Sequence, residues 1–394
     1  MNQPTPLHAR LDRLQYIALV VGVAGLVLSG LGAFLNPIQF FRSYLLAYLF
    51  WLGLTLGCLA ILMVHYLAGG AWGAILRRAL ESGMRTLPLM VVLVVPLLLG
   101  LHEIYIWARP EAVAGDELLR HKSSYLNIPF FVARLAIYFI AWLTIAYLVN
   151  RWSQQQERVT EQAARDLIER RLALLSGLGL TVYGVTMSFA AIDWVMSLEP
   201  SWYSTIYGIL ILVGQLLGAL AFAVVMTSLW AVDGPLSEVI SPGRLHDIGN
   251  LLVTAVLFWA YIAFSQLLII WAGNLPDEVL WYVHRMHGGW QWIGVSLALF
   301  QFALPFLLLL QQNIKENVRR LGMIAAGILF MHVVDMFWVV MPAFYQPGPT
   351  LHWLDAIVLI GVGGLWMTVF AWQLKGRSLL PIHDPSLQGA AEHG

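Results

Sequence analysis

The sequence predicts an all-α integral membrane protein with about ten transmembrane helices. Three observations predict this class: the composition, the length of the apolar segments and the distribution of basic residues. Of the 394 residues, 59% are hydrophobic and only 11% are charged, which leaves too little polar surface for a water-soluble domain. We therefore expect residues 1–394 to form a single membrane domain.

Ten apolar segments are long enough to cross a bilayer, at about 20 residues per crossing. Arg10 and Arg13 precede the first segment, which is longer than the apolar core of a signal peptide and lacks a clear cleavage site, so we expect a retained first span. The ten segments cover residues 14–34, 43–67, 84–106, 129–149, 171–196, 203–230, 247–272, 289–311, 320–341 and 353–373.

Lysine and arginine are divided unevenly between the two faces that these spans define. Of the 22 basic residues, six fall on one face and 22 − 6 = 16 fall on the face that holds both termini. Because cytoplasmic loops are rich in lysine and arginine, we expect both termini in the cytoplasm. The loop at 150–170 has helical propensity throughout, so we expect it to extend the fourth and fifth spans. The six residues of the other face are Arg42, Arg109, Arg120, Lys122, Arg134 and Arg285.

The two halves of the chain share a sequence pattern. IYIWARPE at 104–111 resembles LIIWAGNLPDE at 268–278, and the spacing from Asp193 to Pro200 recurs from Asp335 to Pro342. Repeated bundles are typical of membrane folds. We expect spans two to five (43–196) and spans six to nine (203–341) to form two four-helix bundles. The first span and the last span (353–373) then flank them.

Several kinds of chemistry are excluded by composition. The 22 basic and 22 acidic residues cancel, and a net charge of zero gives no sign of a nucleic-acid partner, so we expect none. The single cysteine, Cys58, excludes an internal disulfide, a cysteine-ligated metal or iron–sulfur cluster and an attached c-type haem. A b-type haem would need paired axial histidines on facing spans, and the sequence shows no such pairing. We therefore expect no metal and no cofactor bound by this chain, so that redox chemistry would need centres in other subunits.

Ionisable side chains at membrane depth indicate a proton path. A charge at the centre of a span costs roughly 2.5–3.5 kcal/mol, so such residues are commonly functional. Asp193 and Asp335 lie about a turn or more inside their helices, and His332 shares a helix face with Asp335. The remaining candidates are Glu199 on the outer side and His246, Asp247 and His65 on the inner side.

A second set of polar residues lies toward the outer face, where a quinone could bind. Alternatives remain open for all of these residues: a histidine near a span end is commonly interfacial, Glu103 could meet Arg109, and His246 and Asp247 could begin a helix. The tryptophans near span ends fit an interfacial belt better than a quinone pocket. The members of this outer set are His102, Glu103, Arg134 and His287.

Four segments carry a resemblance to a known family. AIDWVMSLEPSWYSTIYG (191–208), RLHDIGNLLVTAVLFWAYIAFSQLLIIWAGNLPDE (244–278), MHVVDMFWVVMP (331–342) and WLDAIVLIGVGG (353–364) stand in the same order as in that family. The chain resembles the ActF family of quinone-binding membrane subunits of bacterial alternative complex III. These subunits are similar to the NrfD-like membrane subunits of the polysulfide reductase family, whose core is two four-helix bundles.

The resemblance implies a place in a respiratory complex of the bacterial inner membrane. In that complex, quinol is oxidised near the outer face and electrons pass to cytochrome c or another periplasmic acceptor. Partner subunits, namely a larger NrfD-like subunit, an iron–sulfur subunit and c-type cytochrome subunits, hold the iron–sulfur clusters and haem c. The chain would then be part of an oxidoreductase only within the complex, in contact with lipids and supporting quinol oxidation and proton translocation.

Two other functions remain open from the sequence. A proton-coupled secondary transporter would use similar repeated bundles and midplane carboxylates, and its helices are usually interrupted at midspan. A purely structural membrane subunit would have neither a quinone nor a proton role.

Overall fold

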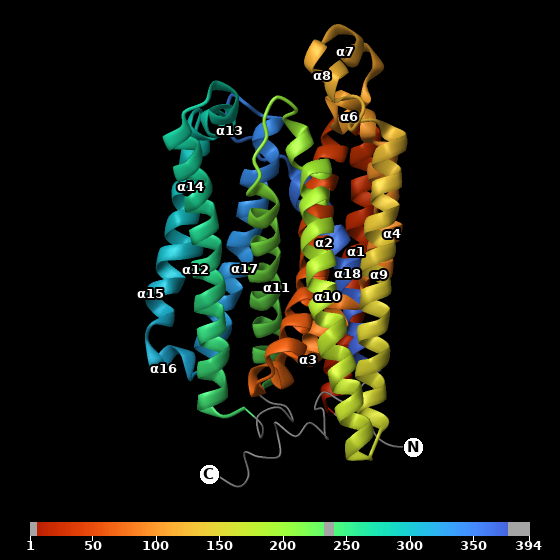
Figure 1. Cartoon of the computed structure of the whole chain (residues 1–394), viewed down its shortest axis with the longest axis vertical. Coiled ribbons are helices and arrows are strands. Elements are labelled where there is room, and N and C mark those ends of the chain that lie inside the picture. Colours follow the sequence, from red (N-terminus) through yellow and green to blue (C-terminus); the bar gives the residue numbers. More distant parts are fainter. Residues whose placement is uncertain (1–5, 232–239, 377–394) are drawn as a thin grey trace.

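The chain folds into a bundle of long, roughly parallel and antiparallel helices (Figure 1). The computed structural model describes residues 6–231 and 240–376, and these residues form helices and turns without a strand. Within them, ten helical segments are long and apolar enough to cross a membrane, which confirms the predicted number of spans. The protein is therefore a multi-pass helical membrane protein.

The first half holds five spans, of which the third is broken into short pieces. Its helices are α1 (Pro6–Leu35), α2 (Pro37–Ala68), α3 (Ala71–Met84), α4 (Leu87–Leu93), α5 (Val95–Leu99), α6 (Leu101–Ile104), α9 (Ile128–Arg158) and α10 (Gln162–Trp194). Short elements follow α6 and α10 at the outer end, namely η1 (Ile106–Ala108), α7 (Pro110–Gly115), α8 (Glu117–Lys122) and η2 (Met196–Leu198).

The second half also holds five spans, and its eighth span contains a π-helical segment. Its helices are α11 (Tyr207–Ala231), α12 (Pro242–Gly273), α14 (Trp290–Ser296), the π-helical η4 (Leu297–Ala303), α15 (Leu304–Leu309), α17 (Val318–Val340) and α18 (Trp353–Lys375). The connecting elements are α13 (Pro276–Met286), α16 (Gln312–Lys315) and η5 (Met341–Ala343).

One span boundary differs clearly from the expected one, and one expected extension is present. The third span begins at Trp72, before the expected residue 84, because the charges at its start are buried and paired: both Arg77 and Arg78 bind Glu81. The extension of the fourth and fifth spans is confirmed, since α9 continues to Arg158 and α10 already begins at Gln162. In α3, α9 and α10, charged residues thus lie within the helices and do not mark where they end.

The first and last spans pack backbone to backbone. A Cβ atom added at Gly25 would lie 2.5 Å from Cα of Gly361, and one at Gly22 would lie 2.7 Å from the backbone nitrogen of Leu365. Small residues allow this close approach between membrane helices. Near the end of α18, Lys375 donates to Gln15 of α1 at 2.5 Å, so α1 begins and α18 ends at the same end of the molecule.

The centre of the molecule is the contact between α2 and α11. In their membrane-crossing parts, 94% of the residues of α2 and 72% of those of α11 are buried, against 28% for α10 and α12. Gly57 of α2 permits the contact, because a Cβ atom there would lie 2.3 Å from the carbonyl oxygen of Gln215. The sites described below lie on either side of this central pair.

The helices that carry Asp193 and Asp335 end in the same way. Helix α10 is followed by the 3₁₀ turn η2, and α17 is followed by the 3₁₀ turn η5. Both aspartates lie on buried faces, with 1% and 7% of their surfaces exposed. The two turns are not in the same register, however, because η2 begins three residues after Asp193 and η5 begins six residues after Asp335. Since α10 ends at Trp194, Asp193 lies nearer the end of its helix than expected, and the partners of the two carboxylates also differ.

Candidate functional site

Asp193 forms an ion pair with Arg134, in which both carboxylate oxygens accept a hydrogen bond. Arg134 of α9 donates from Nε to Oδ2 and from Nη2 to Oδ1, both at 2.8 Å, so the pair is bidentate. Tyr138, one turn further along α9, donates its hydroxyl to Oδ2 at 2.7 Å. A bidentate arginine matches both oxygens of a carboxylate. The charge of Asp193 is thus fully compensated by its own chain.

Arg134 is itself enclosed by aromatic rings near the outer end of α9. Its guanidinium carbon lies 3.9 Å from the ring centroid of Tyr125 and 4.3 Å from that of Phe130. Its Nη1 donates to the carbonyl oxygen of Tyr125 at 3.0 Å. Cation–π contacts of this kind strengthen when water is excluded. Arg134, which we expected near a quinone, therefore pairs with Asp193 and packs against two aromatic rings.

Glu199 joins three outer elements in a second ion-pair site. Its Oε1 accepts from Nη1 of Arg285 at 2.9 Å, and its Oε2 lies 2.9 Å from Nδ1 of His284; both partners are on α13. Arg285 also donates to the carbonyl oxygens of Trp338 and Val339 at the end of α17, at 3.2 and 2.8 Å. We call Glu199, His284 and Arg285 the outer clamp.

The outer clamp keeps Glu199 ionised. Burial alone would raise the pKa of Glu199, but the hydrogen bonds from His284 and Arg285 and their charges outweigh burial and lower it. Arg285 is only 1% exposed and its guanidinium carbon lies 3.7 Å above the ring of Trp281. A carboxylate held in this way binds its proton weakly near neutral pH, which favours a structural role.

Asp335 differs from both of these carboxylates, because no lysine or arginine of the described residues pairs with it. Its Oδ2 accepts from Nε1 of Trp259 on α12 at 3.2 Å. Its other polar neighbour on α17 is His332, whose Nδ1 lies 3.7 Å from Oδ2, beyond hydrogen-bond range. The side chain of Asp335 is 9% exposed, so it is buried at membrane depth without a compensating cation.

His332 is buried with unused hydrogen-bonding capacity. It is 1% exposed, and within the described part of the chain neither ring nitrogen has a hydrogen-bond partner. Its ring packs against Phe50 of α2, with centroids 5.6 Å apart, and against Gly218 of α11. A Cβ atom at Gly218 would lie 2.4 Å from Cδ2 of His332, so glycine makes the space for this ring. Buried polar groups are normally satisfied, and each exception calls for an explanation.

The π-helical segment η4 supplies a further polar side chain to this site. Gln301, at 0% exposure, lies with its amide 3.5 Å from Oδ2 of Asp335. With the amide turned about its axis, Gln301 donates to the carbonyl oxygen of Met331 at 2.9 Å and accepts from Trp259 at 3.3 Å, which satisfies both of its ends. Single π turns within α-helices are frequent at functional sites. All four of these side chains are buried inside the protein. For that reason, and not for their side of the membrane, we call His332, Asp335, Gln301 and Trp259 the inner polar cluster of the second half.

The inner-side candidates lie apart from this cluster. His65 is 9% exposed at the end of α2, where its ring packs against Tyr66 and Trp72. His246 is half-buried and Asp247 is exposed in the first turns of α12. Neither of the latter two begins this helix, since Ser241 is its N-cap and accepts from the backbone of Arg244. No hydrogen-bonded chain among the described residues joins these side chains to His332.

The remaining outer candidates do not assemble into one site. His102 and His287 are exposed, and Glu103 is half-buried. Arg109 binds the backbone carbonyl oxygens of His102 and Glu103, at 2.6 and 3.2 Å, and not the carboxylate of Glu103. Nδ1 of His287 lies 2.9 Å from the carbonyl oxygen of Val283. Among the described residues, no side-chain hydrogen bond or ion pair connects these three residues with each other or with Arg134.

Several residues of the two sites were absent from the sequence prediction. Tyr138 and Trp259 look like ordinary membrane aromatics, and Arg285 was assigned only to the outer basic face. Gln301 could have been found as a polar residue inside an apolar span, although Gln215 and Gln266 also lie buried in spans and share that signal. Within the described residues, no three histidine, cysteine, aspartate or glutamate side chains meet as a metal site.

Comparisons with known proteins identify no relative. No protein-family model matches the chain, and none of the curated proteins compared with it is similar.

Proposed function

We propose that this chain is a membrane subunit of a bacterial quinol-oxidising complex of the alternative complex III type. In this proposal, the second half exchanges protons at the inner polar cluster. The resemblance of the four sequence segments to the ActF family supports the complex. The contrast between the compensated Asp193 and the uncompensated Asp335 supports the proton role and selects Asp335 over Asp193.

The observation that carries the proton role is a carboxylate buried in the membrane without a cation. Transfer of an unpaired charge out of water is very unfavourable, so such a group commonly exchanges a proton and becomes neutral. His332 lies beside Asp335 with both ring nitrogens unpaired among the described residues. An imidazole can accept a proton at one nitrogen and release one from the other. The pair therefore has the chemistry of a proton relay.

The proposal includes a topology. Spans two to five and six to nine form two four-helix bundles, with the first and last spans beside them, and both termini lie in the cytoplasm of the bacterial inner membrane. The uneven distribution of the basic residues supports this orientation. The spacing from Asp193 to Pro200, which recurs from Asp335 to Pro342, supports the repeat.

In the proposed complex, electrons never pass through a centre of this chain. Quinol gives up two electrons to iron–sulfur clusters and c-type haems of partner subunits and releases two protons. This chain binds no cofactor in the proposal, and it contacts lipids and the larger NrfD-like subunit. The residues described here act only on protons.

A proton-coupled secondary transporter is the second candidate, and two observations favour it. The third span, Trp72–Leu99, is interrupted at Arg85–Thr86 and again at Val94, and the eighth span contains the π-helical η4. Discontinuous membrane helices are typical of transporter binding sites. Both functions use Asp335 as the proton-exchanging group, so they differ in the partners and not in the site.

The proposal is tested by purifying the tagged chain in a mild detergent and analysing the proteins that accompany it. We expect c-type haem in the reduced-minus-oxidised optical spectrum and quinol oxidation by the purified material. A colourless, inactive and solitary protein would reject the complex and favour the transporter. In the active complex reconstituted in vesicles, Asp335→Asn is expected to slow quinol-driven proton release by about tenfold or more.

A matched control comes from the first half. Asp193→Asn removes a carboxylate at the equivalent position but leaves Asp335 intact. We expect this variant to lower the yield of folded complex while the molecules that do assemble release protons at the normal rate. Proton release that is unchanged in Asp335→Asn would reject the proton role of the inner polar cluster.

A further inference from the structure

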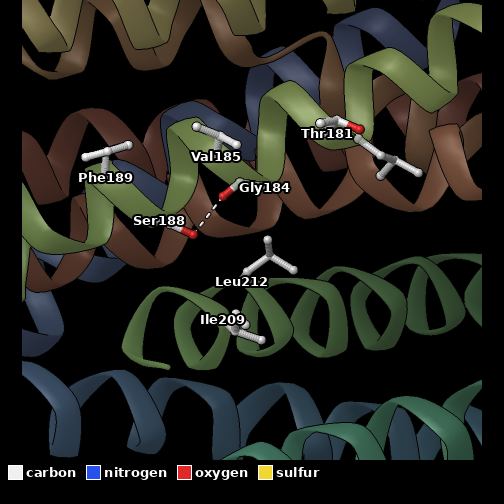
Figure 2. Close-up of a pocket in the computed structure, with 8 residues that line it drawn as sticks. Thr181, Gly184, Val185, Ser188, Phe189, Ile209 and Leu212 are labelled. Carbon is white, nitrogen blue, oxygen red and sulfur yellow. Dashed lines mark hydrogen bonds between the residues drawn. The ribbon is translucent and has the colours of Figure 1, made fainter. Parts of the chain in front are cut away.

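A groove opens on the membrane-facing surface between α10 and α11, apart from the two ion-pair sites (Figure 2). Its volume is about 440 Å³. It lies within two membrane spans, Gln162–Leu198 and Tyr207–Ala231. Its lining residues are Leu180, Thr181, Gly184, Val185, Ser188, Phe189, Ile209 and Leu212.

One glycine lies beside open space in the groove, and another glycine brings the two helices into contact at its outer end. A Cβ atom added at Gly184 would meet no atom within 4 Å, so the missing side chain leaves open space. At Gly208 the two helices touch, since a Cβ atom there would lie 2.7 Å from Cβ of Ser188. The helices thus meet at the outer end and separate along the groove.

The two hydroxyl groups in the groove are already bonded within their own helix. Ser188 donates to the carbonyl oxygen of Gly184 at 2.7 Å, as Figure 2 shows, and Thr181 donates to that of Gly177 at 3.2 Å. The other lining groups are hydrocarbon. The groove therefore offers no unused hydrogen-bond donor to a headgroup, a quinone ring or a chain of water molecules, and it suits a saturated chain.

The size of the groove indicates which apolar group fills it. A helix with its side chains is about 10 Å across, so a volume of this size would hold only about one turn of a partner helix. A single hydrocarbon chain is much thinner and can lie along the groove over several turns of α10. Val185, Phe189 and Ile209 stand at its rim with 55%, 45% and 42% of their surfaces exposed, so the groove is open to the lipid.

We propose that this groove binds one acyl chain of a phospholipid. The chain fills the space that Gly184 leaves and packs α10 against α11, the two spans at the junction of the two halves. Its binding rests on close packing, because an acyl chain gains no hydrophobic free energy by moving from lipid into an apolar groove. The proposal is independent of the proposed function, since it uses none of the ionisable residues.

The test uses the full chain in vesicles of phosphatidylethanolamine and phosphatidylglycerol. A trace of phosphatidylethanolamine with a photoreactive diazirine in its acyl chain is added, and the cross-linked peptides are identified by mass spectrometry. We expect cross-links at 180–189 and 209–212 to exceed, by several-fold, those at equally exposed positions of α12 such as Phe258 and Tyr261. Gly184→Phe fills the groove and is expected to remove this excess.

Gly327→Phe is the matched control. Gly327 is an exposed glycine of α17 whose added Cβ atom would also meet no atom within 4 Å, but it lines no part of the groove. We expect its cross-linking pattern to match the wild type. If Gly184→Phe fails to fold, Gly184→Leu makes the same test with a smaller side chain.

Two results would overturn the proposal. Cross-links distributed evenly over the lipid-facing helices would mean that the groove holds no chain. Cross-links that disappear when a long-chain quinone is added, but not when the same amount of unlabelled phospholipid is added, would assign the groove to a quinone tail.

Discussion

The two halves of the molecule place an aspartate at corresponding positions and surround it with opposite chemistry. Asp193 receives three hydrogen bonds, two from Arg134 and one from Tyr138, at 2.7 to 2.8 Å. Asp335 accepts from two neutral donors, Trp259 at 3.2 Å and the amide of Gln301 at 3.5 Å, and lies 3.7 Å from His332. The same sequence spacing thus carries a carboxylate paired with arginine in one half and a carboxylate without such a cation in the other.

The difference shows which environment allows a buried carboxylate to gain or lose a proton. A carboxylate paired with arginine cannot be protonated without leaving the buried cation uncompensated, which is costly. A carboxylate that faces only neutral donors can change its protonation state without such a cost. Local partners, and not depth in the membrane, therefore separate the two roles.

The largest expected effect comes from leaving Asp193 without its cation. Arg134→Leu should lower the free energy of unfolding in detergent by about 3–5 kcal/mol, because a buried charge loses its partner. Chemical denaturation followed by tryptophan fluorescence measures this change. The double variant Arg134→Leu with Asp193→Leu should regain most of the loss. A single variant as stable as the wild type would show that Asp193 is not held as we describe.

The outer clamp should be the next most sensitive site. Arg285→Leu leaves Glu199 with His284 as its remaining partner in the clamp, and it removes the donor to the carbonyl oxygens of Trp338 and Val339. We expect a loss of about 3 kcal/mol in the same assay. His284→Gln keeps a hydrogen-bond donor near Glu199 and serves as the control, with a smaller loss. Equal losses in the two variants would contradict the central place of Arg285.

The space around His332 should tolerate little added volume. Gly218→Ala puts a methyl group 2.4 Å from Cδ2 of His332, so the buried ring has to move. The expected loss of stability is about 1–3 kcal/mol. Gly214→Ala is the control, because its added Cβ atom would lie 3.4 Å from His332, an ordinary contact. The comparison of the two variants shows whether the position of His332 is fixed by α11.

Acid should weaken the outer clamp by a smaller amount. Interaction with His284 and Arg285 lowers the pKa of Glu199 below its ordinary value despite burial, so the folded state binds a proton less readily than the unfolded state. The stabilisation is then complete above the ordinary carboxyl pKa of about 4.3 and is lost as the pH falls through the lower pKa of the folded state. Glu199→Gln should reduce this loss, as measured by unfolding at a series of acidic pH values.

The sequence predicted the spans well and the partners poorly. Ten spans follow from apolar length alone, and the helical extension at 150–170 follows from propensity. The importance of Asp193 and Asp335 also follows from their cost in the membrane. Whether each carboxylate is compensated depends on helix packing, because Arg134 is 59 positions from Asp193 and Trp259 is 76 positions from Asp335.

Two further features could not be predicted from the regular α-helical spacing of the residues in the sequence. The π-helical segment η4 includes Gln301, whose buried amide lies beside Asp335. The groove beside Gly184 depends on the separation of α10 from α11, which no local pattern in the sequence records. Both features depend on how neighbouring helices deviate from regular packing.

The central claim is that Asp335, and not Asp193, exchanges a proton. Infrared difference spectroscopy of the purified chain, recorded as the pH is changed, detects the carbonyl band of a carboxyl group that gains or loses a proton. We predict a band that is present in the wild type and in Asp193→Asn but missing in Asp335→Asn, with the stability of the latter within about 1 kcal/mol of the wild type. A band that Asp193→Asn removes and Asp335→Asn leaves unchanged would contradict the account.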